Sequence, residues 1–297
     1  MSFVEEEIAS QPDCWARAAG LAPDVAEALP AAGERVAVVG CGTSWFMAMA
    51  YAALREAAGQ GETDAFAASE FPLGRRYDRV VAITRSGTTT EVLGLFDRLP
   101  DAAPTAVLTA VPGAPVVGRT AAPVVLDFAD ERSVVQTRFA TSALALLRAH
   151  LGESLDAAVA DARAVLAEPP ADELVAAEQW SFLGRGWTVG LAHEAALKLR
   201  EAAQAWTEAY PAMEYRHGPI SITAPGRVAW LFGTPPAGLA DDVARTGGLF
   251  VTSARDPMAD LVRAQRVAVA VAASRGLDPD HPRALTRSVI LDGSAGS

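Results

Sequence analysis

The chain has 297 residues, 51% of them hydrophobic and 21% charged, which is enough to bury the core of one large domain or two of ordinary size. Its net charge of -11 argues against a nucleic-acid partner, although a local basic pocket can still hold a small anion. The cysteines, Cys14 and Cys41, are too few for a disulfide framework, and the four histidines are scattered, so we expect no metal site. Composition therefore favours a small-molecule partner and no cofactor.

The sequence shows neither a membrane span nor a secretory signal. Its apolar runs all fall short of the roughly 20 residues that a membrane-spanning helix needs. The first seven residues are acidic, whereas a secretory signal begins with basic residues. We therefore expect a cytoplasmic protein with no membrane partner.

In chain order, the first half alternates apolar strand-like runs with helix-forming segments. A helical stretch over about the first 30 residues precedes a predicted strand at 35–39, and a helix free of Pro and Gly follows at 45–58. Further strand-like runs lie at 80–83, 106–108 and 124–126. This alternation is typical of a mostly parallel sheet covered by helices on both faces.

The second half restarts after a break. Residues 168–172 read Glu-Pro-Pro-Ala-Asp and make the best candidate for a linker. A boundary near residue 168 divides the chain into subdomains of residues 1–167 and 168–297. An apolar run at 180–183 then leads into a helix that we predict to continue to about residue 209.

The two halves share a weak repeat. At an offset of 144 residues, Gly184-Arg185-Gly186 aligns with Gly40-Cys41-Gly42, which favours a duplicated unit. Thr43 of the first loop is matched by the bulky Trp187 of the second. We therefore expect the first copy alone to have kept an anion pocket.

Two strand-to-helix turns of the first half carry hydroxyl groups. Gly40-Cys41-Gly42-Thr43-Ser44 opens a helix, whose free N–H groups favour an anion. The second turn, residues 84–91, has five hydroxyls and Arg85 around one glycine. Neighbouring parallel strands deliver such turns to one edge of a sheet, and helix capping needs only one hydroxyl. The pattern favours phosphate binding over capping.

Charged residues of the second half follow a helical spacing. Glu194, Lys198 and Glu201 fall at i, i+4 and i+7 on one helix face. Spacing alone favours a salt-bridged surface stripe, with an acid–base role as the alternative. His217 lies in the turn-forming run Arg-His-Gly-Pro, which favours a functional histidine over a buried core one.

Taken together, these segments resemble the tandem sugar isomerase (SIS) family. The sequence is similar to the isomerase domain of glucosamine-6-phosphate synthase and its shorter amino-sugar and fructosamine phosphate relatives over about residues 35–292. The segments that carry the resemblance are 43–44, 86–91, 131–139, 182–186, 194–201 and 214–219. It implies an α/β fold with two SIS-type, doubly wound parallel-sheet subdomains in tandem, each a three-layer αβα arrangement.

The resemblance also implies roles for individual residues. Arg85 stands where synthase-like sequences carry Gln, and it would add a charged donor to the phosphate site. Arg138 matches a family Lys that borders the site, and the alternative is an ordinary solvated helix charge. The remaining residues of the implied phosphate site are Thr43, Ser44, Thr84, Ser86 and Thr89, and those that would border the substrate are Gly42, Thr137, Arg138 and Arg287.

For catalysis, the resemblance makes Glu201 the base on the sugar, with Glu194 and Lys198 beside it. His217 would assist ring opening from the neighbouring subunit, which implies a homodimer. Arg287 stands where the synthase has an imine-forming Lys, and a guanidinium cannot be deprotonated to form an imine. We also expect no synthase reaction, because no glutamine-hydrolysing domain has room before residue 35.

A phosphate clamp and a carboxylate near C2 are the parts needed for proton abstraction next to a carbonyl. The leading hypothesis is therefore an isomerase or deaminase acting on a hexosamine or hexose 6-phosphate. The first alternative is a dehydratase or lyase on an N-acetylhexosamine 6-phosphate, through the same enediol. The second is a phosphosugar-sensing module without chemistry.

Overall fold

The computed structural model describes residues 2–100 and 103–291. Contacts divide the chain into two compact units: unit 1 comprises residues 1–13 and 156–283, and unit 2 comprises residues 14–155 and 284–297. The chain thus passes between the units at 13–14, 155–156 and 283–284. A single boundary near residue 168 does not describe the two terminal segments that join the opposite half.

Unit 2 is built on a five-stranded sheet in the order β2-β1-β3-β4-β5, in which every pairing is parallel. The strands are β1 (Val36–Gly40), β2 (Thr63–Ala67), β3 (Arg79–Ile83), β4 (Thr105–Thr109) and β5 (Ala122–Val125). The central strand β1 is buried along its whole length, as expected where helices cover both faces of a sheet.

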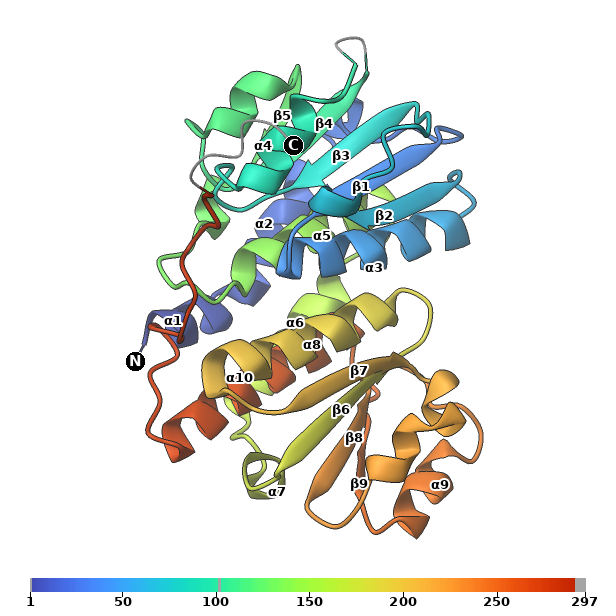
Figure 1. Ribbon diagram of the computed structural model, residues 1–297, viewed down its shortest axis with the longest axis vertical. Helices are drawn as coiled ribbons and strands as arrows, with labels where there is room; N and C mark the ends of the chain where they lie inside the picture. Colours follow the sequence, from blue (N-terminus) through green and yellow to red (C-terminus); the bar gives the residue numbers. More distant parts are fainter. Residues whose placement is uncertain (1, 101–102, 292–297) are drawn as a thin grey trace. The chain divides into compact units, whose positions relative to one another are not determined.

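The helices of unit 2 lie on both faces of this sheet. On one face, α3 (Thr43–Ala57) packs against α5 (Arg138–His150), and on the other α4 (Thr90–Phe96) contributes Val92 and Leu95 to the core (Figure 1). The helix α2 (Gln11–Leu21) leads into the unit. Shorter 3-10 turns are η1 (Ala26–Ala28), η2 (Ala68–Glu70), η3 (Pro115–Arg119) and η4 (Asp127–Ala129).

Unit 1 has a four-stranded parallel sheet in the order β7-β6-β8-β9. Its strands are β6 (Gln179–Gly184), β7 (Thr207–Pro211), β8 (Arg227–Leu231) and β9 (Leu249–Val251). Its helices are α1 (Phe3–Ala9), α6 (Asp156–Ala167), α7 (Asp172–Val175), α8 (Thr188–Ala203), α9 (Leu239–Arg245) and α10 (Pro257–Ser274), with η5 (Glu214–His217) and η6 (Pro219–Ile222).

In unit 1, α8 and α10 pack together on one face of the sheet and α9 covers the other (Figure 1). The predicted α/β class with doubly wound parallel sheets is therefore confirmed. In both sheets the first strand of the unit lies second in spatial order, as a duplicated unit would give. Duplication itself stays a prediction.

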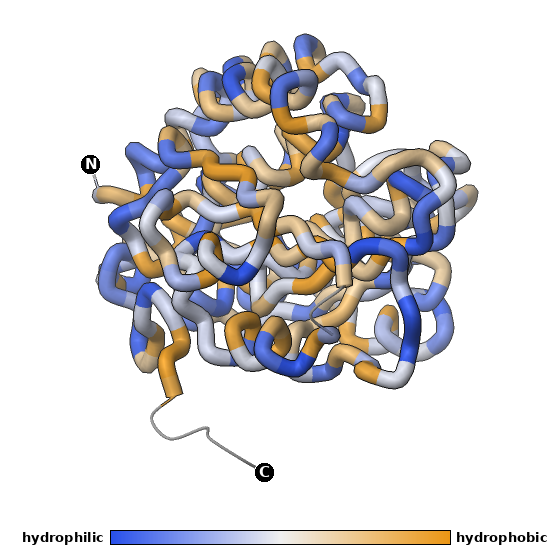
Figure 2. Tube along the Cα trace, turned by 90° about the horizontal axis from the view of Figure 1, so that it is seen from above, coloured by the Kyte–Doolittle hydropathy of each residue, from blue (hydrophilic) through white to orange (hydrophobic). Residues whose placement is uncertain are grey.

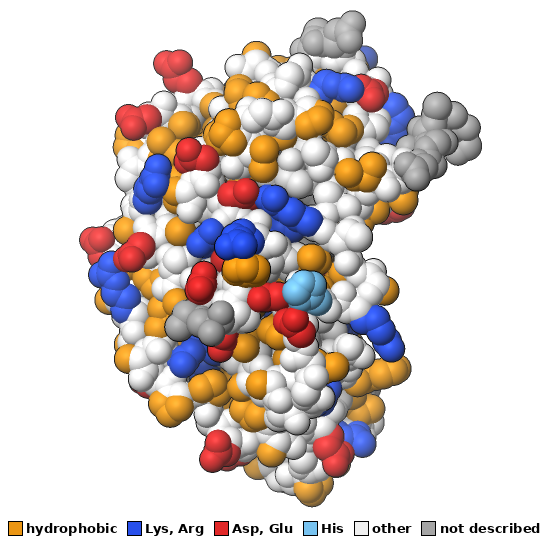
Figure 3. Space-filling view, turned by 90° about the vertical axis from the view of Figure 1, so that its left-hand side faces the viewer, with side chains coloured by type: hydrophobic (Ala, Val, Ile, Leu, Met, Phe, Trp, Pro, Cys, Tyr) orange, Lys and Arg blue, Asp and Glu red, His pale blue; other side chains and the backbone are white. Residues whose placement is uncertain are grey.

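Most of the helices carry both buried and exposed residues. Hydrophilic and hydrophobic residues succeed one another along them (Figure 2), as expected for helices that cover a sheet with an apolar stripe. Basic and acidic side chains are interspersed on the face drawn in Figure 3, so this face shows no extended basic surface of the kind that nucleic-acid binding needs. Within the described ranges, no helix is long and apolar enough to span a bilayer.

The predicted helix to about residue 209 is wrong at its end. The helix α8 ends at Ala203, and Gln204 takes the left-handed conformation with φ 50°. Non-glycine residues rarely adopt this conformation, so the residue type at position 204 does not mark the end of the helix. The chain then forms β7, an edge strand paired with β6. The strands β2, β8 and β9 were also not among the predicted ones.

Asp260 of α10 is a buried acid in the core of unit 1. Its Oδ2 accepts a hydrogen bond from Trp230 Nε1 at 2.9 Å, and Arg263 Nη1 lies 3.6 Å from its Oδ1. Burial raises the pKa of Asp260, and the contacts with Trp230 and Arg263 oppose this rise. Burial is the larger effect, so ionised Asp260 is less favourable in the folded protein than in the unfolded chain.

We expect Asp260→Asn to become more stable relative to the wild type as pH rises from about 4 to neutrality. Because the folded pKa lies above the unfolded one, the folded state holds this proton more tightly, and its loss costs stability as pH rises through that window. Asparagine keeps an acceptor for Trp230 and cannot ionise. Urea unfolding of both proteins at several pH values measures the free energy of unfolding of the variant minus that of the wild type. A value that falls with rising pH would contradict the assignment.

Candidate functional site

The centre of the sheet in unit 2 is a topological switch point. The strands β1 and β3 are adjacent and parallel, and from them the sheet continues to β2 on one side and to β4 and β5 on the other. Ligands of open parallel sheets bind at the carboxyl ends of the strands at such a point. The two hydroxyl-bearing loops follow β1 and β3, so the structure brings them to the same edge of one sheet.

The loop after β1 requires glycine at two positions. A Cβ on Gly40 would lie 2.6 Å from the carbonyl carbon of Ser44, and Gly42 has φ 53°, a region that side chains disfavour. Gly42 is the N-cap of α3 and supplies no side-chain cap. Thr43 and Ser44 are buried and form the first helical residues. The loop thus presents the start of a 15-residue helix, as an anion site requires.

Ser86, Thr88 and Thr89 of the loop after β3 form a cluster of hydroxyls with Ser288 of the C-terminal segment, hereafter the hydroxyl cluster. Ser86 Oγ donates to Ser288 Oγ at 3.1 Å, and Thr88 Oγ1 donates to Ser86 Oγ and to Ser288 Oγ at 2.9 Å. Thr89 Oγ1 lies 3.5 Å from Ser288 Oγ. Thr84, at the start of this loop, is buried. Sequence reasoning assigned no role to Ser288, which is 202 residues from Ser86.

Arg85 belongs to the same loop, and its side chain is buried. Its guanidinium donates to Glu131 Oε2 at 3.4 Å and to the carbonyls of Ser133, Val134 and Arg287 at 3.1, 3.3 and 2.8 Å. The side chains of Arg85 and Glu131 are 1% and 0% exposed. These contacts make Arg85 an organiser of the surrounding loops, while direct phosphate binding by Arg85 stays a prediction.

Thr137 and Arg138 lie at the start of α5, where Glu131 caps them. Glu131 Oε1 accepts from the backbone N–H groups of Thr137 at 2.6 Å and Arg138 at 2.8 Å. The Arg138 side chain is half-buried and its Nε donates to the Asp130 carbonyl at 2.9 Å. Arg138 is therefore tied to this segment, which argues against an ordinary solvated charge.

Arg287 forms an ion pair with Asp130. Both side chains are partly exposed, at 42% and 38%. A guanidinium paired with a carboxylate stays charged and offers no nucleophilic nitrogen. The residue therefore anchors the C-terminal segment, residues 284–291, to the loop that precedes α5.

In unit 1, α8 carries the predicted acid–base residues. Lys198 Nζ lies 2.5 Å from Glu201 Oε2 and 3.5 Å from Glu194 Oε1. Glu194 and Lys198 are each 1% exposed, and Glu201 is 17% exposed. A surface stripe does not describe this group, because two of its three members are buried. Glu201 is the member that reaches solvent.

His217 is the last residue of η5 and is exposed. Gly218, which follows it, has φ 133°, so the chain turns there as the sequence predicts. A buried core histidine is thereby excluded for this position. His217, Glu194, Lys198 and Glu201 all belong to unit 1, whereas the loop residues and Arg287 belong to unit 2.

Cys41 lies between the two glycines of the first loop. Burial, and after it the negative charge of Glu91, raises the pKa of Cys41 to about 11. We expect iodoacetamide at about pH 8 to alkylate Cys41 about 100-fold more slowly than a small thiol, because the thiolate is scarcer by that factor. Mass spectrometry of the peptide that contains Cys41 follows the reaction, and a rate within about tenfold of the small thiol would contradict the raised pKa.

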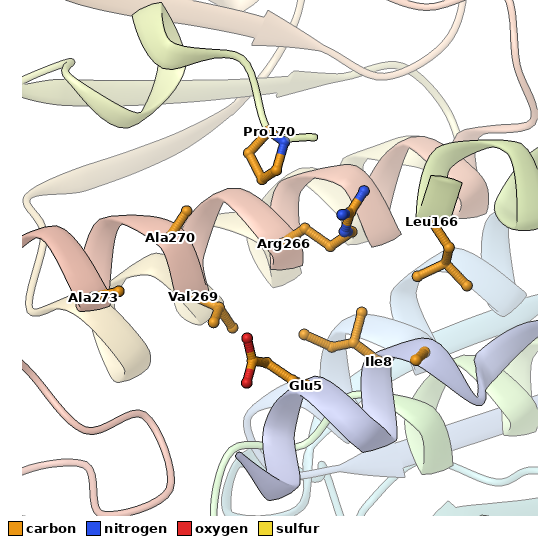
Figure 4. Close-up of a pocket in the computed structure, with 9 residues that line it drawn as sticks. Glu5, Ile8, Leu166, Pro170, Arg266, Val269, Ala270 and Ala273 are labelled. Carbon is orange, nitrogen blue, oxygen red and sulfur yellow. The ribbon is translucent and has the colours of Figure 1, made fainter. Parts of the chain in front are cut away.

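Unit 1 also has a pocket of about 390 Å³, which none of the predicted site residues lines. It lies between α1 and α10, with Ile8 and Val269 facing each other across it (Figure 4). The Glu5 carboxylate accepts from the N–H of Ser2 at 2.7 Å, and Arg266 donates to the carbonyls of Val165 and Glu168. Among the described residues, no group of three or more His, Cys, Asp or Glu is placed to hold a metal ion.

Curated proteins similar in sequence to this chain include two aminotransferases. No family model matches the chain. The chain is 28% identical, over 87% of its length, to the isomerizing glutamine–fructose-6-phosphate aminotransferase of Gloeobacter violaceus, and 27% identical, over 98%, to that of Methanothermobacter thermautotrophicus. It covers 52% and 58% of those two proteins, so it spans about half the length of the curated relatives it matches.

Solved structures share the fold. Glucosamine-6-phosphate deaminase from Thermotoga maritima superposes with a TM-score of 0.80 at 24% identity, covering 98% of this chain and 100% of that one. Tagatose-6-phosphate ketose/aldose isomerase from Escherichia coli gives 0.79 at 18% identity, covering 95% and 97%. The chain is thus similar in sequence to sugar-phosphate aminotransferases and has the fold of sugar-phosphate isomerases and deaminases.

Proposed function

We propose that the protein is a phosphosugar isomerase or deaminase that acts on a hexosamine or hexose 6-phosphate by removing the proton at C2. The observation that carries the proposal is the α8 group, in which a partly exposed carboxylate, Glu201, is bonded to a buried ammonium, Lys198. The relatives support it, since their names describe enzymes that act on fructose 6-phosphate, glucosamine 6-phosphate and tagatose 6-phosphate.

In the proposed mechanism Glu201 is the general base. Lys198 donates to its Oε2 at 2.5 Å, which holds the carboxylate in one orientation. Glu194, 3.5 Å from the same ammonium, fixes Lys198 from the other side. A base held in one orientation contributes about 10²- to 10⁴-fold to such a step. His217 assists ring opening from the neighbouring subunit of a homodimer, and the enzyme acts in the cytoplasm.

The phosphate is assigned to the switch-point loops of unit 2. Hydroxyl and amide donors at such a loop suit a dianion. Arg85 holds the surrounding segments in place through its hydrogen bonds to the carbonyls of Ser133 and Arg287. Gly42, Thr137, Arg138 and Arg287 border the bound substrate. The proposed phosphate ligands are Thr43, Ser44, Thr84, Arg85, Ser86 and Thr89.

A second candidate is a dehydratase or lyase on an N-acetylhexosamine 6-phosphate. The observation that favours it is Arg287, which is ion-paired with Asp130 and cannot form an imine with a sugar carbonyl. Chemistry that needs no imine at this position, such as elimination from the enediol, then remains available.

The test is incubation of the protein with a panel of hexose, hexosamine and N-acetylhexosamine 6-phosphates in D2O. We expect solvent deuterium at C2 of the substrate. Mass spectrometry of the products of a parallel incubation in H2O separates the reactions: an unchanged mass with altered retention indicates isomerisation, ammonia release indicates deamination, and loss of water indicates dehydration. Tight binding without deuterium at C2 would overturn the enzyme proposal in favour of a sensing module.

A further inference from the structure

The C-terminal segment of unit 2 is seated on the loop to which the phosphate is assigned. Ser288 Oγ is the only hydroxyl of the hydroxyl cluster that contacts all the other three, Ser86, Thr88 and Thr89, at 2.9 to 3.5 Å. A phosphate oxygen bound by Ser86 and Thr89 would need to lie at about 2.7 Å from each hydroxyl. Ser288 Oγ therefore stands close to where that oxygen would lie.

Backbone groups of the segment complete this arrangement. The Val289 carbonyl accepts from the N–H of Thr90 at 3.1 Å, and the N–H of Leu291 donates to Thr90 Oγ1 at 2.9 Å. The Arg287 carbonyl accepts from Arg85 at 2.8 Å. The segment thus supplies oxygen atoms, a hydroxyl and two carbonyls, to the donors of this loop.

The segment is held by polar contacts rather than by burial. Val289, Ile290 and Leu291 are 50%, 65% and 53% exposed, so little apolar surface would be uncovered if the segment left the loop. Exposed hydrogen bonds with few apolar contacts open at a small free-energy cost. A phosphate dianion offers charge-assisted hydrogen bonds, which are roughly twice as strong as the neutral bonds between hydroxyls.

We infer that Ser288 occupies, in the free protein, the position that a phosphate oxygen takes when an anion binds the hydroxyl cluster. Anion binding and release of residues 288–291 are then a single linked event, while Arg287 stays paired with Asp130. This inference rests on the proposed phosphate site and adds that the site is closed by the protein's own chain. Because the two events are linked, weakening the segment must raise anion affinity by the same factor.

The test is the Ser288→Ala variant, titrated with inorganic phosphate and with glucosamine 6-phosphate by isothermal calorimetry. We expect its Kd for both to fall by about threefold to tenfold, because the variant no longer loses a neutral hydrogen bond on binding. Ser274→Ala is the matched control, since Ser274 Oγ donates to the Val271 carbonyl of its own helix at 2.8 Å, and the Kd of this variant should equal that of the wild type.

Hydrogen exchange adds an independent readout. In the wild type, saturating phosphate should speed amide exchange in the peptide that spans residues 284–291. If the wild type binds phosphate normally and Ser288→Ala binds it no more tightly, the inference about Ser288 is wrong while the phosphate site stands. Weaker binding by the variant would make Ser288 a phosphate ligand. Slower amide exchange of this peptide in the phosphate-bound wild type would also overturn the inference about Ser288. Absence of binding by both proteins would overturn the phosphate site and the inference with it.

Discussion

Glu201→Gln should lower turnover by about 10²- to 10⁴-fold, the contribution of a positioned general base. Glutamine keeps the shape of the side chain and an acceptor for Lys198, 2.5 Å away, but it cannot take a proton. Substrate Kd should change little, because the phosphate is assigned to other residues. The turnover number from steady-state kinetics and the rate of deuterium incorporation at C2 should fall together, since both report the same proton transfer.

The matched control is Glu173→Gln on α7. Glu173 is exposed and the substitution removes the same charge, so turnover should be unchanged. A Glu201→Gln variant that keeps full turnover would remove Glu201 from the role of base. If deuterium exchange persisted while product formation ceased, Glu201 would act after the C2 step instead.

Arg85→Met should destabilise the protein by about 3 kcal/mol, at the lower end of the cost of breaking a buried ion pair. The substitution leaves Glu131 buried without its cation and removes the donor to the carbonyls of Ser133, Val134 and Arg287. The backbone donors at Thr137 and Arg138 keep the cost from being larger. Urea unfolding followed by far-UV circular dichroism measures it.

Arg17→Met serves as the comparison for Arg85. Arg17 pairs with Asp127 at 3.7 Å, and both side chains are more than 60% exposed, so its removal should cost less than about 1 kcal/mol. The double variant Arg85→Met with Glu131→Gln should recover part of the loss, because no buried charge remains uncompensated. Equal effects of Arg85→Met and Arg17→Met would show that the buried pair is not a structural support.

The sequence predicts the central strands β1, β3 and β6 because their physics is local, although it does not predict the central strand β8. The apolar runs that form β1, β3 and β6 are bounded by glycine or hydroxyl-rich turns, and a strand buried on both faces has no other composition available. The edge strands β2 and β7 mix apolar residues with Thr63, Asp64 and Glu208. They form because a neighbouring strand offers hydrogen bonds, which no short window of sequence records.

The same distinction applies to the candidate site. The loops at the ends of β1 and β3 follow from strand patterns and glycine positions. The burial of Arg85 and the contacts of Ser288 depend on residues about 200 positions away, so spacing along the chain does not reveal them. The burial of Glu194 and Lys198 is likewise not visible in their spacing, because a helical wheel gives only the shared face.

The passage of the chain between the two units has a consequence for synthesis on the ribosome. Residues 14–155 emerge early, directly after residues 1–13, but the segment from 284 that belongs to the same unit is made only after all of residues 156–283. During that interval the nascent sheet of unit 2 must hold its loops without Ser288, and Arg85 lacks the acceptor at Arg287. Folding of unit 2 is therefore completed late, although its sheet is translated early.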